Sequence, residues 1–236
     1  LLENAGIRKF LAGPESFTPD TNTLLGEVPE VKNFFVCCGF NSIGIVSAGG
    51  AGKVTAEWMI NGEVNEDVFS LDITRFEKFH SETNFIIDRA AESLGNQYAM
   101  HWPYKQQKTS RNIKTFPYHD LLKKEGACFG QVAGFESPLW YAIDGEKPEF
   151  KYSFGYQNWY KSAQNETINT RKNVGFFELT PFAKFEIEGE AAYSSLQYLC
   201  SNDIKNNDGA ITYTQMLNSK GGIEADLSVT CISKNK

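Results

Sequence analysis

The sequence predicts a mixed fold, with an α/β unit first and α+β segments after it. Three observations predict it: an apolar run that ends at a glycine near residue 39, aromatic residues at helical spacing between 76 and 94, and alternating apolar and polar residues over 210–232. The 236 residues are 41% hydrophobic and 14% aromatic, which suffices for a sizeable core in one or two domains.

The first unit begins with residues 34–40, FFVCCGF, an apolar run typical of a strand buried on both faces. A helix is predicted after it, with Asn41 or Ser42 as its N-cap and a stop at Asn61-Gly62. Four glycines lie inside or near this helix: Gly44, Gly49, Gly50 and Gly52. Each costs about 0.8–1 kcal/mol relative to alanine inside a helix, which is tolerable if something approaches the helix closely.

The middle of the chain changes character. A helical stripe that stops at Gly95 is formed by Phe76, Phe79, Phe85, Ile86, Ala90 and Leu94. The run KQQKTSRNIK, residues 105–114, carries four basic residues and predicts a solvated connector. We therefore predict three domain segments: residues 1–62, 63–115 and 116–236.

The last segment mixes helix and strand signals. Helices are predicted at 118–126, 158–175 and 190–200, and strands at 127–136 and 182–189. A hairpin is predicted from AITYTQML and IEADLSVTCI, because both arms alternate and the turn NSKGG supplies glycine.

Composition excludes several classes of function. The net charge of −6 argues against nucleic-acid binding, which needs a basic face, and no run approaches the roughly 20 apolar residues of a membrane helix. No secretory signal is visible. The five cysteines include no CxxC pair or Cys/His cluster, which predicts no metal and reduced packing thiols in a reducing compartment, the cytoplasm or a mitochondrial matrix. His101 and His119 show no metal spacing and are predicted to be structural or surface residues.

The two ends of the sequence suggest a piece of a longer polypeptide. Residue 1 is Leu, and LLENAGIRKF already has the character of a domain interior. The last segment stops at Lys236, just after an alternating strand. We therefore expect an internal segment of a larger protein.

The glycine turn after the first strand is the first candidate site. A helix N-terminus attracts anions, and glycines let a flat or charged ligand touch the backbone. The turn lacks GxGxxG spacing, and Val54 stands where a phosphate-binding P-loop needs Ser or Thr. A tight crossing of helix and sheet uses the same glycines, so both interpretations stay open.

Three long motifs favour the ligand interpretation. Residues 13–63 contain GPESFTPD, GFNSIG and AGGAGKVTAEWMINGE, and this stretch strongly resembles the closing segment of the flavin domain in the dimethylglycine and sarcosine dehydrogenase family. DITRF through YAMHWP resembles the family's small linker domain, and YHDLLKKEGACFG through GGIEADLSV resembles the first part of its aminomethyltransferase-type folate-binding domain. The resemblance implies the C-terminal edge of a flavin-binding α/β domain, a linker domain, and the start of an aminomethyltransferase-like α+β domain.

The same resemblance implies an FAD-dependent oxidoreductase acting on the CH–NH group of dimethylglycine or sarcosine. FAD accepts a hydride from the N-methyl carbon, and tetrahydrofolate takes up the carbon as 5,10-methylene-tetrahydrofolate. The residues expected against the isoalloxazine ring are Gly39, Phe40, Asn41, Ser42, Ile43 and Gly44, because backbone dipoles stabilise the negative charge that hydride arrival creates. Pro14, Ser16 and Thr18 would line the floor of this site, or the prolines simply mark turns.

The hairpin carries the expected folate chemistry. By the resemblance, Asp226 is the catalytic residue that steers proton transfer at the folate amine, and Tyr213 contacts the pterin. A four-residue turn would place these two residues opposite each other, and partial burial would raise the pKa of Asp226. The alternative is that Asp226 is an exposed polar residue of an alternating strand.

Phe182 is the remaining candidate for cofactor contact. It follows Thr180-Pro181, where the aminomethyltransferase branch carries Ser-His-Met, so it keeps an apolar pterin contact or is a core aromatic. The resemblance places covalent flavin attachment and the amine-activating residues upstream of residue 1 and names no electron acceptor. Two alternatives stay open: a non-catalytic folate-binding or regulatory module, and a stand-alone aminomethyltransferase, which leaves residues 1–115 unexplained.

Overall fold

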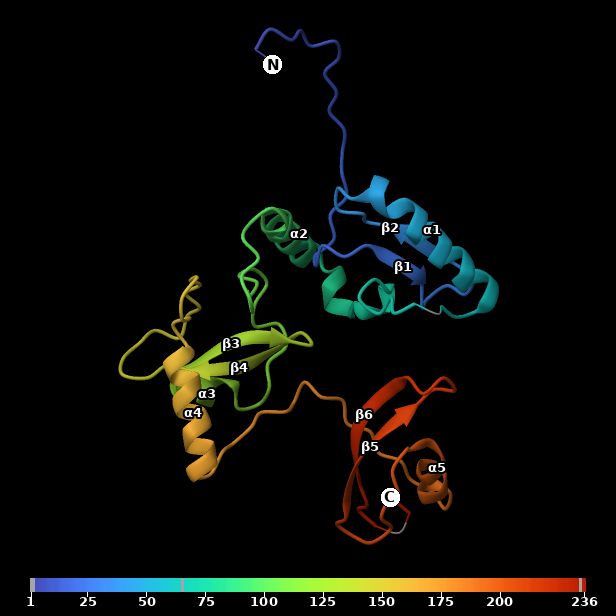
Figure 1. The fold of residues 1–236 in the computed structure, drawn as a ribbon, viewed down its shortest axis with the longest axis vertical. Coiled ribbons are helices and arrows are strands. Elements are labelled where there is room, and N and C mark those ends of the chain that lie inside the picture. Colours follow the sequence, from blue (N-terminus) through green and yellow to red (C-terminus); the bar gives the residue numbers. More distant parts are fainter. Residues whose placement is uncertain (1–2, 65, 234) are drawn as a thin grey trace. The chain divides into compact units, whose positions relative to one another are not determined.

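The computed structural model describes residues 3–64, 66–233 and 235–236, and its packing forms two units, Leu1–Pro181 and Phe182–Lys236 (Figure 1). Unit 1 contains, in order, β1 (Leu24–Glu27), β2 (Phe35–Cys38), α1 (Gly44–Asn61), the 3-10 turns η1 (Ile73–Arg75) and η2 (Lys78–Ser81), α2 (Thr83–Gln97), α3 (His119–Lys124), β3 (Ala127–Val132), β4 (Phe135–Tyr141) and α4 (Tyr160–Lys172). Unit 2 contains α5 (Ala192–Leu199), β5 (Ile211–Leu217) and β6 (Ile223–Thr230). The strands form three small antiparallel pairs, which confirms the mixed α and β fold at this level.

The apolar run at residues 34–40 forms a short strand in a hairpin. β2 pairs antiparallel with β1, from Leu24 opposite Cys38 to Glu27 opposite Phe35. Cys37 and Cys38 are exposed, so the prediction of a strand buried on both faces, with both thiols packed inside, is wrong. In the part of the chain that the structure describes, β2 pairs with one strand, β1.

Helix α1 follows the glycine turn and contacts the β1–β2 hairpin (Figure 1). Its N-cap is Ile43, which makes no side-chain cap, so the predicted cap at Asn41 or Ser42 is wrong. The reason is that the Asn41 side chain is used elsewhere, in the bonds described below. The predicted stop is confirmed, because Gly62 caps the helix in the left-handed region at φ 77° and donates its N–H to the Trp58 carbonyl.

We expect Gly62→Ala to lower the free energy of unfolding by about 1 kcal/mol, because a Cβ strains the left-handed conformation. No atom lies within 4 Å of the added Cβ, so the cost is conformational only. Urea denaturation measures it. Gly49→Ala is the matched control: that position is also free of contacts but lies inside α1, so the change should stabilise the protein.

The aromatic stripe at 76–94 is not one helix. Glu77 and Glu82 adopt extended conformations, which separate η2 from its neighbours and start α2 at Thr83. Helix α2 then continues past Gly95 to Gln97. Its buried residues are Phe85, Arg89 and Ser93, so the stripe predicted only part of the packed face.

Between residues 116 and 181, unit 1 is built around the β3–β4 hairpin, which α3 and α4 contact. α3 and α4 agree with the predicted helices, and they contact β3 and β4 respectively. The strand predicted over 127–136 is confirmed for Ala127–Val132 but not beyond, because Ala133 and Gly134 turn the chain at φ 48° and 78° before β4 begins at Phe135. Trp140, only 1% exposed, is the largest fully buried side chain.

In unit 2, α5 precedes the β5–β6 hairpin, and both agree with the predicted elements (Figure 1). The strand predicted over 182–189 is wrong: this segment has no regular structure, and Phe182 and Phe185 are 68% and 86% exposed. Its backbone lies beside no described strand that would complete a ladder, so its apolar alternation produces no sheet.

All five cysteines are free thiols. Burial raises the pKa of Cys128 to about 12, so this thiol stays protonated and unreactive at neutral pH. Among the described residues, no helix combines the length and apolar character needed to cross a bilayer.

Candidate functional site

Asn41 is the centre of the glycine turn. It is 1% exposed and has a positive φ of 50°. Its side-chain oxygen accepts the Thr18 backbone N–H at 2.8 Å, and its amide nitrogen donates to the Gly39 carbonyl at 2.6 Å. Its own N–H donates to the Ser16 carbonyl at 3.3 Å. These bonds hold the start of α1 on the segment at 16–18.

Gly39 is required by this local packing. Its φ is 67°, and a Cβ built there would lie 2.7 Å from Thr18 Cγ2. Thr18 is itself 3% exposed. The glycine at this position therefore has a structural explanation that needs no ligand.

Most of the residues that follow Asn41 in the turn and at the start of α1 are exposed to solvent. Ser42 is exposed at φ 66°, Ile43 is 44% exposed, and Ile45 in the first turn of α1 is fully exposed. The first backbone N–H groups of a helix point beyond its end and carry partial positive charge. The residues present thus fit a flat, electron-accepting ring with a polar edge at this helix start.

Helix α2 supports the turn from the other side, a connection that the sequence patterns did not reveal. Gln97 Nε2 donates to the Asn41 carbonyl at 2.7 Å, and Ser93 Oγ donates to the Pro19 carbonyl at 2.6 Å. Each of these two donors lies more than fifty residues along the chain from the carbonyl to which it donates. Long-range bonds of this kind leave no local signal. Of the other predicted floor residues, Ser16 contributes its carbonyl and Pro14 is exposed.

The basic run at 105–114 is a packed network, and the prediction of a solvated connector is wrong. Arg111 Nε donates to Glu136 Oε1 at 2.8 Å, and a second Arg111 nitrogen pairs with Oε2 of the same carboxylate. The Glu136 side chain is 1% exposed. Lys114 forms an ion pair with Glu77 at 2.7 Å, and its ammonium lies 4.2 Å from the Phe135 ring centroid. Charge spacing alone did not reveal these partners.

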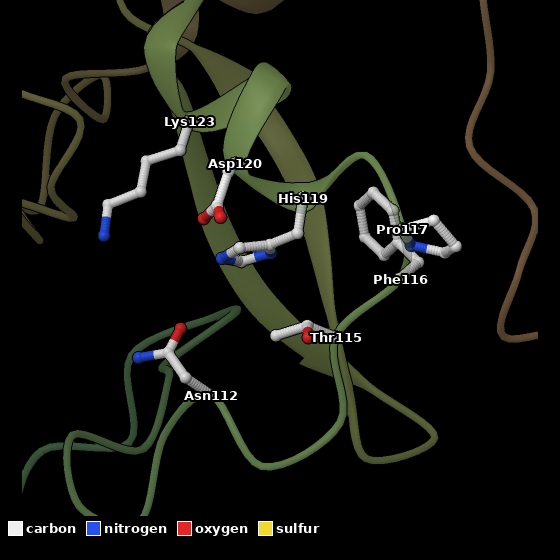
Figure 2. A pocket seen from close by; sticks show the side chains of 7 residues that line it. All are labelled: Asn112, Thr115, Phe116, Pro117, His119, Asp120 and Lys123. Atoms are coloured by element: carbon white, nitrogen blue, oxygen red, sulfur yellow. The ribbon is translucent and has the colours of Figure 1, made fainter.

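A cavity of about 530 Å³ lies beside α3 (Figure 2). It is lined by Asn112, Thr115, Phe116, Pro117, His119, Asp120 and Lys123. The His119 ring, 8% exposed, lies between Asp120 and Asn112 in this view and packs on Phe129 with ring centroids 4.1 Å apart. His119 is therefore a buried structural histidine, as predicted, although its buried Nδ1 has no hydrogen-bond partner among the described residues. It borders a polar cavity that no sequence motif marked.

Tyr213 and Asp226 lie on one face of the β5–β6 hairpin. Tyr213 is opposite Ser228, and Asp226 is opposite Gln215, so the predicted direct pairing is wrong. A bulge at Met216/Leu217 and the connection over 218–222 set this register. The two residues are diagonal neighbours, and their side chains are hydrogen-bonded to each other.

Asp226 is exposed, and its hydrogen bonds favour the ionised carboxylate. Hydrogen bonds from the Tyr213 hydroxyl and then from Gln215 Nε2, at 2.9 Å, lower the pKa of Asp226 below its ordinary value. The expected rise through burial is wrong, because the side chain lies in solvent. Among the described contacts, no hydrogen bond or ring contact joins Phe182 to this pair.

We expect Tyr213→Phe to raise the pKa of Asp226 towards its ordinary value, because the carboxylate loses its strongest donor and keeps Gln215. A titration of the Asp226 side-chain carbon by NMR measures this. Tyr198→Phe is the control, since Tyr198 is 89% exposed and belongs to α5. An unchanged titration in Tyr213→Phe would show that the hydroxyl does not bond Asp226 in solution.

Two family models match this chain. Residues 61–115 match the FAD dependent oxidoreductase central domain, and residues 118–236 match the GCVT N-terminal domain. The chain is 43% identical over 229 residues to a 4-methylaminobutanoate oxidase (formaldehyde-forming) of Paenarthrobacter nicotinovorans, covering 97% of this chain and 28% of that protein. It is 32% identical over 255 residues to the mitochondrial sarcosine dehydrogenase of Mus musculus, covering 98% and 28%.

A third relative bears a different kind of name. The chain is 36% identical over 238 residues to the mitochondrial pyruvate dehydrogenase phosphatase regulatory subunit of Mus musculus, covering 99% of this chain and 27% of that protein. The chain thus spans between a quarter and a third of the length of these relatives. The two domain models follow each other in the order that the resemblance implied, and the chain belongs to the dimethylglycine and sarcosine dehydrogenase family.

Proposed function

We propose that the chain is part of an FAD-dependent oxidoreductase that demethylates an N-methyl amine, dimethylglycine or sarcosine, and passes the carbon to tetrahydrofolate. The observation that carries the proposal is the succession of the two family matches in one chain. It supports a division into a flavin-domain segment at 1–62, a linker domain at 63–115 and a folate-domain segment at 116–236. The protein would act on small methylated amines in the cytoplasm or a mitochondrial matrix.

In the flavin half, the turn Gly39–Gly44 would hold the ring edge. FAD supplies the hydride acceptor. The exposed helix start of α1 offers N–H dipoles to the charge that builds up on that edge, and Asn41 keeps those dipoles in place without reorganisation. α1 also exposes Ile45 and Ile60, 102% and 82% accessible, which supports its packing against further protein.

In the folate half, the hairpin face would meet the pterin. Tetrahydrofolate supplies the amine that takes up the carbon. Tyr213, 60% exposed, offers its ring to a stacking partner, while Asp226 stays ionised at neutral pH and can accept a proton. Phe182 is proposed as a second apolar contact.

A single assay on the intact protein tests both halves. Sarcosine, dimethylglycine and 4-methylaminobutanoate are added anaerobically, flavin reduction is followed by absorbance, and formaldehyde and 5,10-methylene-tetrahydrofolate are quantified with and without tetrahydrofolate. We expect flavin reduction by at least one amine. In Asp226→Asn, reduction should persist while the carbon is recovered as formaldehyde instead of methylene-tetrahydrofolate.

Asp208→Asn is the matched control, because Asp208 is an exposed carboxylate before β5 and outside the Tyr213–Asp226 face. Equal methylene-tetrahydrofolate yields from both variants would refute the role of Asp226. Failure of every amine to reduce bound flavin would refute the oxidoreductase itself.

That second failure would support another candidate, a non-catalytic regulatory module. The observation that favours it is the similarity to a regulatory subunit over nearly the whole chain. A regulatory module of this kind would keep folate binding on the hairpin face. Retained folate binding without any flavin reduction would therefore select this second candidate.

A further inference from the structure

Arg89 is a buried cation that forms no ion pair with any described carboxylate, although Glu92 and Glu136 interact with it electrostatically from further away. It lies on the inner face of α2 and is 7% exposed. Its terminal nitrogens donate to neutral acceptors, the Gln131 side-chain oxygen at 3.1 and 3.2 Å and the Thr109 carbonyl at 2.8 Å. Among the described ion pairs none includes Arg89, and its buried Nε–H has no hydrogen-bond partner. A buried charge in this state is costly unless something compensates it.

Arg89 borders a cavity of about 190 Å³. Its lining also includes Asp20, Arg75, Phe76, His80 and Phe85. Arg75 and Asp20 neutralise each other, through bonds of 2.7 and 3.1 Å between guanidinium and carboxylate. Among the charged residues that line the cavity, only Arg89 is left without a bonded carboxylate, and Glu92, which interacts with it electrostatically, does not line the cavity.

His80 adds a second donor. Its Nδ1 lies 2.9 Å from the Glu77 backbone nitrogen and 3.2 Å from the Glu77 carbonyl oxygen. In the tautomer in which Nδ1 accepts the Glu77 N–H, the ring proton is on Nε2. Burial lowers the pKa of His80, against the opposing effect of Glu77, so the ring is neutral at neutral pH. The ring packs on Phe79, with centroids 3.8 Å apart, and edge-on to Phe85 at 5.1 Å.

We propose that this cavity binds a small monocarboxylate with a short apolar tail, held by Arg89 Nε–H and His80 Nε2–H. The single net charge of the site matches a monoanion, whereas a phosphate dianion would leave an unmatched negative charge beside Asp20. Phe76 and Phe85 supply apolar walls for the tail. The proposal is independent of flavin and folate chemistry, because no residue of the two predicted cofactor sites lines this cavity.

The NMR signal of the Arg89 Nε–H group reports binding directly. In a ¹H–¹⁵N spectrum of the intact protein, the Arg89 Nε–H signal is identified by its loss in the Arg89→Lys variant. Butanoate, added up to roughly 50 mM to reveal a millimolar dissociation constant, should shift the Arg89 signal in a saturable way. The Arg111 Nε–H, which is bonded to Glu136 at 2.8 Å, should not move and serves as the internal control.

Two comparisons decide the chemistry of the ligand. Butylammonium should leave the Arg89 signal unchanged, and inorganic phosphate should bind at least tenfold more weakly than butanoate. Equal binding of phosphate would overturn the assignment to a monocarboxylate. Absence of any saturable shift with butanoate would overturn the site.

A variant tests the second donor without removing Arg89. His80→Phe keeps a ring of similar size but loses the Nε2–H, so butanoate affinity should fall about 3- to 10-fold. His101→Phe is the matched control, because His101 is exposed and does not line the cavity. An equal affinity in His80→Phe and His101→Phe would contradict the proposed geometry.

Discussion

Replacing Asn41 by alanine is expected to lower the free energy of unfolding by about 2–4 kcal/mol, because it strips partners from buried backbone groups. The Thr18 N–H loses its acceptor at 2.8 Å, and the Gly39 carbonyl loses its donor at 2.6 Å. Alanine is also less tolerant than asparagine of the positive φ at this position. Urea denaturation with linear extrapolation measures the change.

Ser42→Ala is the control for this prediction. Ser42 is the next residue, also has a positive φ, and is exposed. Apart from the cost of placing alanine at this positive φ, the replacement should change the free energy of unfolding by about 0.5 kcal/mol or less. If Asn41→Ala and Ser42→Ala lower the free energy of unfolding equally, the Asn41 side chain does not hold the turn and does not preorganise the start of α1.

Glu136→Gln is the second large effect, and we expect a loss of about 2–4 kcal/mol in the free energy of unfolding. The substitution leaves the Arg111 guanidinium without a counter-charge. Arg111 is 23% exposed and Glu136 is 1% exposed, so part of the freed charge is solvated and the expected loss lies towards the lower end of values for buried pairs.

The surface pair Lys151–Glu149 gives the matched control. Its side chains are 67% and 51% exposed at a distance of 3.1 Å, so Glu149→Gln should cost less than about 0.5 kcal/mol. The double variant Arg111→Met/Glu136→Leu should lose less than the sum of the single variants, because it removes both charges together. Additive losses would show that the two side chains do not interact in solution.

The Glu136 pair also predicts an acid dependence. Burial acts to raise the pKa of Glu136, but the hydrogen bonds from Arg111 and from the Asn112 N–H outweigh it and lower the pKa. A lowered folded-state pKa contributes stability above the ordinary carboxyl pKa of about 4.3 and loses it as the pH falls through the folded value. The stability difference between wild type and Glu136→Gln should therefore be constant near neutrality and shrink below about pH 4.

Local chemistry was sufficient for several elements of this fold. Gly62 ended α1 as the Asn-Gly pair predicted, and the alternation at 210–232 predicted the β5–β6 hairpin. Both signals depend on neighbouring residues, through left-handed glycine and period-two burial. The Ala133–Gly134 turn was missed, because the flanking residues are apolar enough to pass for one strand.

The sequence by itself determined the order of the two matched domains, the position of the glycine turn and the hairpin that carries Tyr213 and Asp226. Only the tertiary structure decided the surroundings of the charges. It brings Glu136 to Arg111, leaves the buried Arg89 Nε without a hydrogen-bond partner, and gives Asp226 hydrogen bonds from Tyr213 and Gln215 that lower its pKa. The physical reason is that solvation and ion pairing depend on groups that approach from distant parts of the chain, whereas turns and hairpins depend on adjacent residues.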